Sequence, residues 1–433
     1  MKSARDRLCW RMEPSAGRIF GSAAALLGLL LTGCVSRGPV ATPTLPNGGL
    51  DAFYASSVGV GRTPVSGVVF RDSGREIRRE MLDLIRGARH SILVGSFLLT
   101  DGPASREVLE ALVAKSREGV IVRVLGDTSS RFVEEEEAFS FLANAGVPTV
   151  EFNPPRIWHL CAPHRLLERD HRKYWVIDGR LLFLGGANLS DLSLIPPEEG
   201  GNRDLMVRLE SPDAARELTR SFISTWKQSH PRLALPEEAL LSDVSRRRGS
   251  ETSAWFFNQE SVSGEVSLTE AMFDGLFASA QKTVWLVEPY TFTEARILDS
   301  VRAMTARGVV VHIVLSSRVR APRFHYASFY GIQDLLEAGA RVWIFDSEIS
   351  PLHYKCAVID DRLAYVGSAN LNHRSLRLSR ELSLVFEDPP GVKAITEVIG
   401  SVRKNAREVT REEAAHYRGL PFLTWWLIMQ SAG

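Results

Sequence analysis

The residues best suited to chemistry occur twice in the sequence, in the same order and at the same spacing. Each set is a histidine, a lysine two residues later and an aspartate five residues after the lysine, the pattern HxKxxxxD. Seven residues after each aspartate a glycine-rich turn begins, and it ends in an asparagine. The two sets are His171, Lys173, Asp178 and Asn188, and His353, Lys355, Asp360 and Asn370. One such pattern arises by chance, but two copies that share the glycine and the asparagine indicate a functional site.

The apolar runs YWVI and CAVI within the two motifs predict strands, whose side chains alternate between two faces. The histidine and lysine of each motif therefore share a face. If the two motifs meet about a pseudo-two-fold axis, two imidazoles, two ammonium groups and two amides converge, a set that fits one phosphate. Asp178 and Asp360 fall on the opposite face, so strand parity predicts structural anchors.

A pair of histidines suggests a two-step phosphoryl chemistry. One neutral imidazole attacks the phosphorus and forms a phosphohistidine, and the other, protonated, gives its proton to the leaving alkoxide. Charge on the non-bridging oxygens would be balanced by Lys173, Lys355, Asn188 and Asn370. No cluster of histidine, cysteine and aspartate has the spacing of zinc ligands, so we predict neither a metal nor a cofactor.

Each histidine needs a carboxylate that fixes its tautomer. The candidates are Asp204 and Glu381, because each follows its Gly-rich turn by a short interval and precedes an apolar strand.

The elements that position these residues also occur twice. From residue 75 onward a helix, an apolar strand, a helix, a strand, a helix and a strand succeed one another, and the same order begins again near residue 270. Strands that alternate with helices predict an α/β class. We expect two duplicated α/β domains, each a mainly parallel sheet flanked by helices, related by a pseudo-two-fold axis and sharing one active site.

Residues 1–33 predict a signal peptide, because arginines precede an apolar run at 19–31 that is too short to span a bilayer. The run ends in Leu-Thr-Gly-Cys, which resembles the bacterial lipobox and implies lipid attachment at Cys34. Val35 stands where an inner-membrane retention signal has aspartate, which favours a periplasm-facing outer-membrane lipoprotein of the bacterial envelope. The further predicted parts are a flexible tether at 34–68, a first domain at 69–230, a linker at 231–250, a second domain at 251–410 and an apolar tail at 411–433.

Composition narrows the class of protein. The 433 residues are 45% hydrophobic and carry a net charge of +1, which excludes disorder and multi-span membrane architecture. The near-zero charge weighs against nucleic acid as a partner. Free thiols are favoured over a disulfide for Cys161 and Cys356. The tail around Trp425 and Trp426 either packs on the domain or dips into a lipid interface.

The paired motifs resemble the phospholipase D superfamily over nearly all of residues 70–400. RDHRK with IDG and GGAN, and GSANLNHRS in the second half, are similar to bacterial cardiolipin synthase, apart from Asn372 and Ser379, which replace a usual aspartate and asparagine. The resemblance implies His171 as nucleophile and His353 as acid, and it includes Asp178 and Asp360 among the motif's catalytic residues.

The resemblance implies a phosphatidyltransferase that joins two phosphatidylglycerols at a membrane surface. The alternatives are a hydrolytic phospholipase D or phosphodiesterase, including a nuclease, in which water replaces the alcohol acceptor, and a non-enzymatic lipid-binding scaffold.

Overall fold

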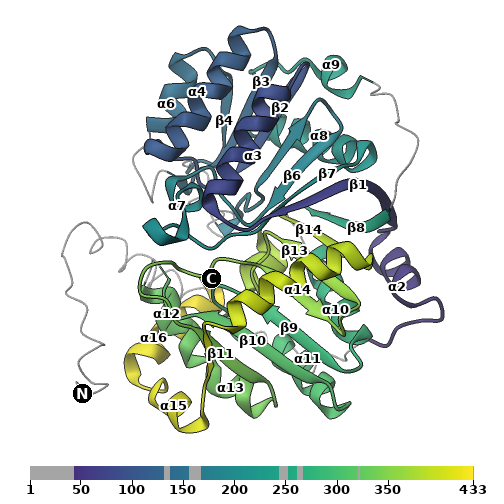
Figure 1. Cartoon of the computed structure of the whole chain (residues 1–433), viewed down its shortest axis with the longest axis vertical. Helices are drawn as coiled ribbons and strands as arrows, with labels where there is room; N and C mark the ends of the chain where they lie inside the picture. Colours follow the sequence, from purple (N-terminus) through teal and green to yellow (C-terminus); the bar gives the residue numbers. More distant parts are fainter. Residues whose placement is uncertain are drawn as a thin grey trace.

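The computed structural model describes residues 43–130, 137–155, 167–242, 252–260, 267–319 and 322–432. The predictions for residues 1–33, for Cys34 and Cys161 and for the linker from 243 to 250 lie outside the described residues. Figure 1 shows two α/β halves, one above the other. The later part of the chain forms the lower half and most of the earlier part forms the upper half, but the helix at residues 49–58 lies beside the lower half.

The first half follows the predicted alternation of strands and helices. Its helix α3 begins after Ser73, whose hydroxyl accepts a hydrogen bond from the Glu76 amide and so caps the helix. Its elements are α2 (Gly49–Val58), β1 (Arg62–Arg71), α3 (Gly74–Gly87), β2 (Ser91–Ser96), α4 (Pro103–Arg117), β3 (Ile121–Asp127), α6 (Glu137–Asn144), β4 (Thr149–Phe152), β5 (Tyr174–Ile177), β6 (Leu181–Gly185), α7 (Asp191–Leu194), a 3₁₀ turn (Pro197–Glu199), β7 (Met206–Glu210), α8 (Pro212–Ser229) and α9 (Glu237–Leu241).

The second half repeats this order and adds helices at its end. Its elements are β8 (Thr252–Gln259), α10 (Leu268–Ser279), β9 (Thr283–Val287), α11 (Ala295–Ala306), β10 (Val310–Ser316), α12 (Pro322–Tyr330), α13 (Ile332–Glu337), β11 (Arg341–Phe345), β12 (Cys356–Ile359), β13 (Leu363–Gly367), a π-helical turn (Arg374–Leu378), β14 (Glu381–Phe386), α14 (Pro389–Arg403), β15 (Ala406–Glu408), α15 (Arg411–His416) and α16 (Leu420–Ala432). The tail predicted at 411–433 is therefore helical, and α16 packs against α12.

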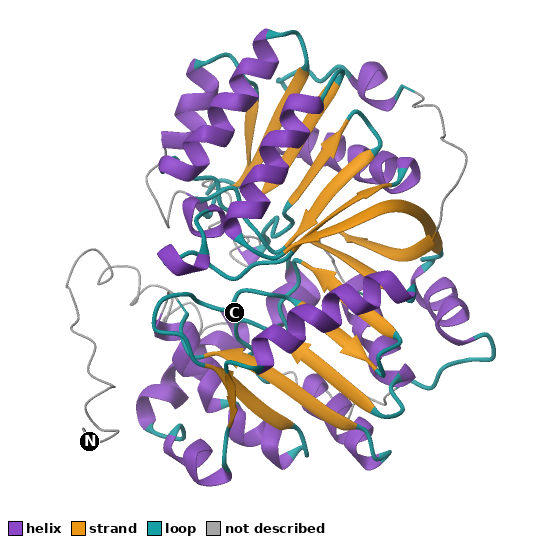
Figure 2. Ribbon diagram, viewed as in Figure 1, coloured by secondary structure: helices purple, strands orange, loops and turns teal. Residues whose placement is uncertain are grey.

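The described strands form a single sheet in the order β15-β11-β10-β9-β12-β13-β14-β8-β1-β7-β6-β5-β2-β3-β4, with helices on its faces (Figure 2). The α/β class and the duplication are confirmed, but the prediction of mainly parallel sheets is wrong. Parallel pairing joins only β2, β3 and β4 in one half and β9, β10 and β11 in the other. The physical reason is the tight β5–β6 and β12–β13 turns, which can join only antiparallel strands.

Strand β1 corrects the predicted tether, because residues 49–71 are folded as α2 and β1. The start of β1 pairs with β8 and its end pairs with β7, so this strand joins the two halves into one sheet. Helix α2 is fixed by the buried Tyr54, whose hydroxyl donates a hydrogen bond of 2.9 Å to the Met272 carbonyl. The glycines and prolines of this stretch suggested a linker, but Gly67 adopts a positive φ of 59° where the β1–β7 register shifts.

Asp178 and Asp360 end β5 and β12 and act as backbone anchors, as strand parity predicts. The Asp178 carboxylate accepts hydrogen bonds from the amides of residues 89, 90 and 91, at 2.7 to 3.2 Å. Asp360 accepts from the amides of residues 281, 282 and 283, at 2.7 to 2.8 Å. These bonds tie each β-hairpin to the start of its neighbouring strand. The geometry therefore does not support a catalytic role for either aspartate.

The anchors give a first testable prediction. Asp360→Ala should lower the free energy of unfolding by about 1–3 kcal/mol, because three backbone amides lose their acceptor. Asp360→Asn, which keeps one acceptor oxygen, should lose less. Urea denaturation followed by circular dichroism measures both variants, and equal stability of Asp360→Ala and the unchanged protein would contradict the anchoring role.

Candidate active site

The two motif histidines each pair with a carboxylate from the other half of the molecule. His171 Nδ1 lies 3.0 Å from Glu381 Oε1, and His353 Nδ1 lies 2.8 Å from Asp204 Oδ2. Both carboxylates are fully buried. The structure thus brings together these four predicted residues, and it assigns each carboxylate to one histidine, which the sequence did not. Each motif histidine is thus paired with a carboxylate that its own half does not supply.

Backbone hydrogen bonds hold each pair in place. The His171 amide donates to the Arg380 carbonyl at 3.1 Å, and the Arg380 amide donates to the Arg169 carbonyl at 2.8 Å. The other half repeats this arrangement, because the His353 amide donates to the Arg203 carbonyl at 2.8 Å. The residue before each carboxylate is therefore bound to the segment that carries its histidine.

The carboxylates differ in how the glycine-rich turns support them. The Ser368 hydroxyl donates a hydrogen bond to Glu381 Oε2. The equivalent residue in the first half is Gly186, where an added Cβ would lie 2.4 Å from Asp204 Oδ1. Asp204 instead accepts a 3.3 Å hydrogen bond from the Ser193 hydroxyl. The turn beside Asp204 thus has a glycine where a side chain would clash with the carboxylate. The turn beside Glu381 has a serine there, and its hydroxyl binds the carboxylate.

The motif lysines are buried beside the histidines. Lys355 Nζ lies 3.0 and 3.1 Å from the ring nitrogens of His353, and Lys173 Nζ donates to the His171 carbonyl. Burial lowers the pKa of Lys173 to about 7 and also lowers the pKa of Lys355. Two buried cations close to one another are costly, so the site favours an anion.

The same environment keeps the imidazoles neutral. Burial, and next the charge of Lys173, lowers the pKa of His171 to about 4 against the opposing effect of Glu381. Burial also lowers the pKa of His353, while Asp204 favours its protonated form. Because each Nδ1 faces a carboxylate, Nδ1 carries the proton of the neutral ring and Nε2 is left as the nucleophilic atom.

The two predicted asparagines are buried, and each lies three residues after the end of β6 or β13. Asn188 Oδ1 accepts a hydrogen bond of 3.1 Å from the Leu98 amide. Asn370 Nδ2 donates one of 3.3 Å to the Tyr290 hydroxyl. Each amide is thus held by the segment that follows β2 or β9, the strand next to its own β-hairpin.

The sequence did not reveal Glu288, which distinguishes the two halves of the site. Val287 lies opposite Cys356, so Glu288 follows opposite Lys355, whereas Ser96 takes the equivalent place opposite Lys173. Glu288 is fully buried, and burial raises its pKa well above the ordinary value. Its Oε2 accepts a 3.3 Å hydrogen bond from the Leu371 amide. One feature of the sequence could have indicated Glu288. It directly follows a buried parallel strand, a position where functional residues often lie.

Aromatic side chains that the sequence did not single out line the two sides of the site. The Phe97 ring centroid lies 4.8 Å from that of His171. On the other side Tyr290 stacks on Phe324 at 5.0 Å and on Phe292 at 5.2 Å. Phe97 and Tyr290 follow β2 and β9, so the same positional signal applies to them.

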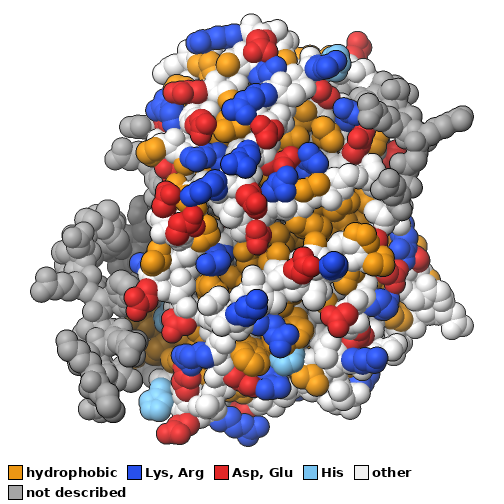
Figure 3. Space-filling view, viewed as in Figure 1, with side chains coloured by type: hydrophobic (Ala, Val, Ile, Leu, Met, Phe, Trp, Pro, Cys, Tyr) orange, Lys and Arg blue, Asp and Glu red, His pale blue; other side chains and the backbone are white. Residues whose placement is uncertain are grey.

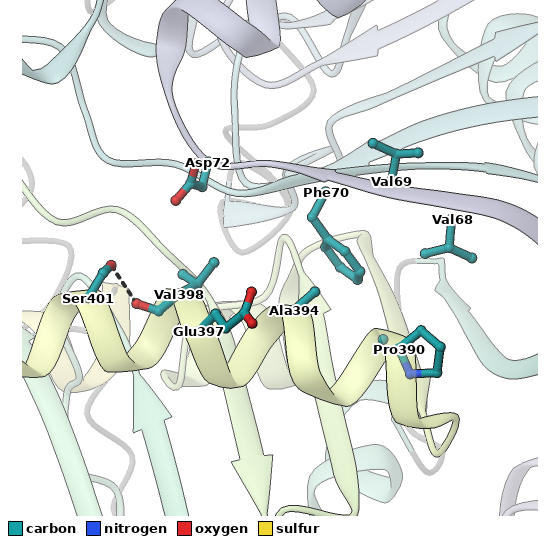
Figure 4. A pocket seen from close by; sticks show the side chains of 10 residues that line it. Val68, Val69, Phe70, Asp72, Pro390, Ala394, Glu397, Val398 and Ser401 are labelled. Atoms are coloured by element: carbon teal, nitrogen blue, oxygen red, sulfur yellow. Dashed lines mark hydrogen bonds between the residues drawn. The ribbon is translucent and has the colours of Figure 1, made fainter.

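A groove of about 480 Å³ lies elsewhere, between β1 and α14. Figure 4 shows Phe70 and Val69 on one side and Ala394 and Val398 on the other, and Figure 3 shows hydrophobic side chains gathered over the same part of the surface. None of the predicted site residues lines it. Across the described part of the chain, no three His, Cys, Asp or Glu side chains are grouped so that they could hold a metal ion.

The chain is similar in sequence to known proteins. A family model described as "Cardiolipin synthase, PLD-like domain" matches residues 81–226 and 275–403. Cardiolipin synthase A of Pseudomonas entomophila is 30% identical over 343 residues, which are 76% of this chain and 67% of the relative. Cardiolipin synthase 2 of Bacillus anthracis is 27% identical over 75% of this chain, and the match spans 62% of that relative's length.

Solved structures share the fold at low sequence identity. Phosphatidylserine synthase of Haemophilus influenzae superposes with a TM-score of 0.66 at 17% identity, over 83% of this chain and 92% of that one. Polyphosphate kinase of Porphyromonas gingivalis gives a TM-score of 0.51 at 12% identity, over 81% and 54% of the two chains. These likenesses establish the architecture of paired α/β halves.

The buried lysines give a prediction for pH dependence. If the site turns over a phosphodiester, kcat/KM should fall as the pH rises through the neutral range. Lys173, whose pKa is about 7, then loses its charge, and the acid His353, whose pKa burial lowers, loses its proton. On the acid side kcat/KM should fall only near pH 4, where His171 becomes protonated. Lys173→Arg should remove the part of the alkaline fall that comes from Lys173, since a guanidinium stays charged, and should leave the part set by His353. An alkaline limb of unchanged shape in this variant would contradict the assignment of Lys173.

Proposed function

Because the chain belongs to the family of phospholipase D-like cardiolipin synthase domains, we propose that it is a phosphatidyltransferase that joins two phosphatidylglycerol molecules and releases glycerol. The observation that carries the proposal is the pair of histidines, each held by a carboxylate from the other half. Two imidazoles beside two buried lysines suit a phosphodiester, which brings one negative charge and needs both a nucleophile and an acid.

In the proposed first step, His171 Nε2 attacks the phosphorus of one phosphatidylglycerol. An N–P bond forms, the P–O bond to the glycerol headgroup breaks, and protonated His353 gives its proton to the departing glycerol oxygen. Asp204 favours the protonated form of His353, and the anionic substrate adds to this effect. Lys173, Lys355, Asn188 and Asn370 would stabilise the non-bridging oxygens.

In the second step a hydroxyl group of the second phosphatidylglycerol attacks the phosphohistidine. His353 takes the proton of that hydroxyl, a new P–O bond forms and the N–P bond breaks, so both histidines return to their starting state. Transfer to an alcohol requires that water compete poorly. The side chains of the two histidines are only slightly exposed, 12% for His171 and 22% for His353, and an aromatic ring flanks the site. Both features limit the access of water and so favour transfer over hydrolysis.

The proposed function is tested by lipid mass spectrometry after incubation with phosphatidylglycerol. We expect cardiolipin and glycerol, and we expect turnover to persist in EDTA, since lysines meet the charge of the phosphate. His171→Ala and His353→Ala should each abolish turnover. Phosphatidic acid as the main product would instead indicate a hydrolytic phospholipase D, and strict dependence on a divalent metal would contradict the mechanism.

The assignment of roles is tested with a phosphodiester that has a good leaving group. Such a substrate needs little protonation to react, so His353→Ala should form the first intermediate and then hold it. Peptide mass spectrometry should find an acid-labile adduct on His171 and none in His171→Ala. An adduct on His353 would reverse the two roles.

We further propose that the protein is a lipoprotein held at Cys34, with the signal peptide removed, and that it faces the periplasm from the outer membrane. The support is the short apolar run and the Leu-Thr-Gly-Cys sequence that ends it. Residues 35–48 would then link the lipid to α2 as a short tether.

The anchor is tested by metabolic labelling with radioactive palmitate. The unchanged protein should be labelled and should fractionate with the outer membrane. Cys34→Ala should lose both properties, because the variant lacks the thiol that carries the lipid. Equal labelling of Cys34→Ala would disprove the anchor.

A further inference from the structure

Helix α16 is largely apolar, although its exposed side includes the polar Thr424. Its sequence, LPFLTWWLIMQSA, contains no charged residue. A helix that is apolar all round is normally buried in a protein core or in lipid. One face of α16 is exposed, so the helix needs another explanation.

The inner face of α16 packs on α12. Phe422 meets Tyr326 with ring centroids 4.9 Å apart, and Trp426 meets Tyr330 at 5.2 Å. Trp426 Nε1 also donates a 3.4 Å hydrogen bond to the Thr293 hydroxyl. These contacts fix the helix rigidly to the second half.

The outer face carries two leucines seven residues apart, which places them above one another on the helix. Leu420 is 75% exposed and Leu427 is 53% exposed. They account for two of the four large hydrophobic side chains in the described residues that are exposed, and the other two, Val310 and Ile349, stand alone elsewhere. Thr424, which is also exposed, lies between them, and its hydroxyl donates a hydrogen bond of 2.9 Å to the Leu420 carbonyl. The two leucines therefore form a narrow, mostly apolar edge.

The inner face of α16 packs toward the candidate active site. Met429 and Trp426 belong to one hydrophobic group with Tyr290, Phe292 and Phe324. The hydroxyl of Tyr290 accepts the hydrogen bond of Asn370 described above. Packed aromatic side chains thus connect the inner face of α16 to an amide of the site.

The edge fits a lipid surface better than a protein partner. A stable protein interface buries roughly 1,200–2,000 Å² in total, which two leucines cannot supply. A helix of leucines with half-buried tryptophans is suited to the boundary between headgroups and acyl chains. At about 20 Å the helix is shorter than the bilayer core of about 30 Å. None of the helices in the described part of the chain is long and apolar enough to cross a membrane.

A positive charge lies in the right place for anionic headgroups. Arg323 is exposed near the start of α12, with its guanidinium 5.0 Å from the ring centroid of Phe324. Phe324 stacks on Tyr290, so the guanidinium lies at the rim of the same aromatic group.

We propose that α16 lies in the plane of the lipid interface through Leu420 and Leu427, and that it seats the mouth of the active site on the bilayer. The choice of lipid as partner rests on the phospholipid substrate of the proposed function. The acyl anchor at Cys34 keeps the protein near the membrane but, on a tether, does not orient it. Helix α16 supplies the orientation.

Position 427 is tested with a fluorescent label in the full, lipid-anchored protein. Leu427→Cys, with Cys161→Ser to remove a competing thiol, carries an environment-sensitive dye, while Cys356 is buried. The vesicles contain phosphatidylethanolamine, phosphatidylglycerol and a lipid with a nitroxide on its acyl chain. We expect the dye at 427 to lose most of its emission. The same dye at Val310→Cys should keep its emission, because Val310 is an exposed apolar residue outside α16, at the start of β10. Equal emission at both positions, as in a dimer that covers α16, would overturn the proposal.

A second variant separates docking from catalysis. Leu420→Asp/Leu427→Asp should lower the rate on phosphatidylglycerol vesicles by about tenfold or more, because at least about 1.4 kcal/mol of apolar burial is lost. Its rate on a water-soluble, short-chain phosphatidylglycerol should not change. Equal loss on both substrates would overturn the docking role. Absence of turnover by the unchanged protein would refute the proposed function, and the label would still report on docking.

Discussion

The two crossed histidine–carboxylate pairs are the interactions on which the rest of the molecule depends. A buried carboxylate without a partner is costly, so Asp204 and Glu381 require the histidine of the opposite half. That requirement forces the two duplicated units to fold against one another. Strand β1 meets it by joining the two halves into one sheet, and Arg172 adds a hydrogen bond of 2.8 Å across the seam to Asn258 of β8.

Buried charge also makes the site favourable for an anion. Lys173 and Lys355 are buried, which lowers their pKa, and a bound phosphate would restore their preference for the charged state. The two halves are nevertheless not equivalent, because the residue paired with Lys355 across the sheet is Glu288, whose charge acts on Lys355, whereas the residue paired with Lys173 is the uncharged Ser96. A duplicated fold has thereby acquired two chemically distinct sides, as a reaction with one nucleophile and one acid requires.

The same fold distributes its apolar surface between core and periphery. Most hydrophobic side chains fill the layers between the sheet and its helices. The aromatic group around Tyr290 extends outward from the site to α12 and α16. The packed aromatic group that connects the site to α12 and α16 thus belongs to the second half. The first half contributes Phe97, which lies beside His171.

The sequence by itself determined the α/β class and the duplication and indicated the candidate residues of the site, because strand periodicity and repeated spacing are local properties of the chain. Strand parity even separated the anchors Asp178 and Asp360 from the histidines. The sequence could not determine that Glu381 pairs with His171 and Asp204 with His353. Nor could it determine that β1 is a central strand, or that Glu288 lies opposite Lys355 in the sheet. Those contacts join residues far apart in the sequence, and only the tertiary packing of the two halves decides which distant side chains meet.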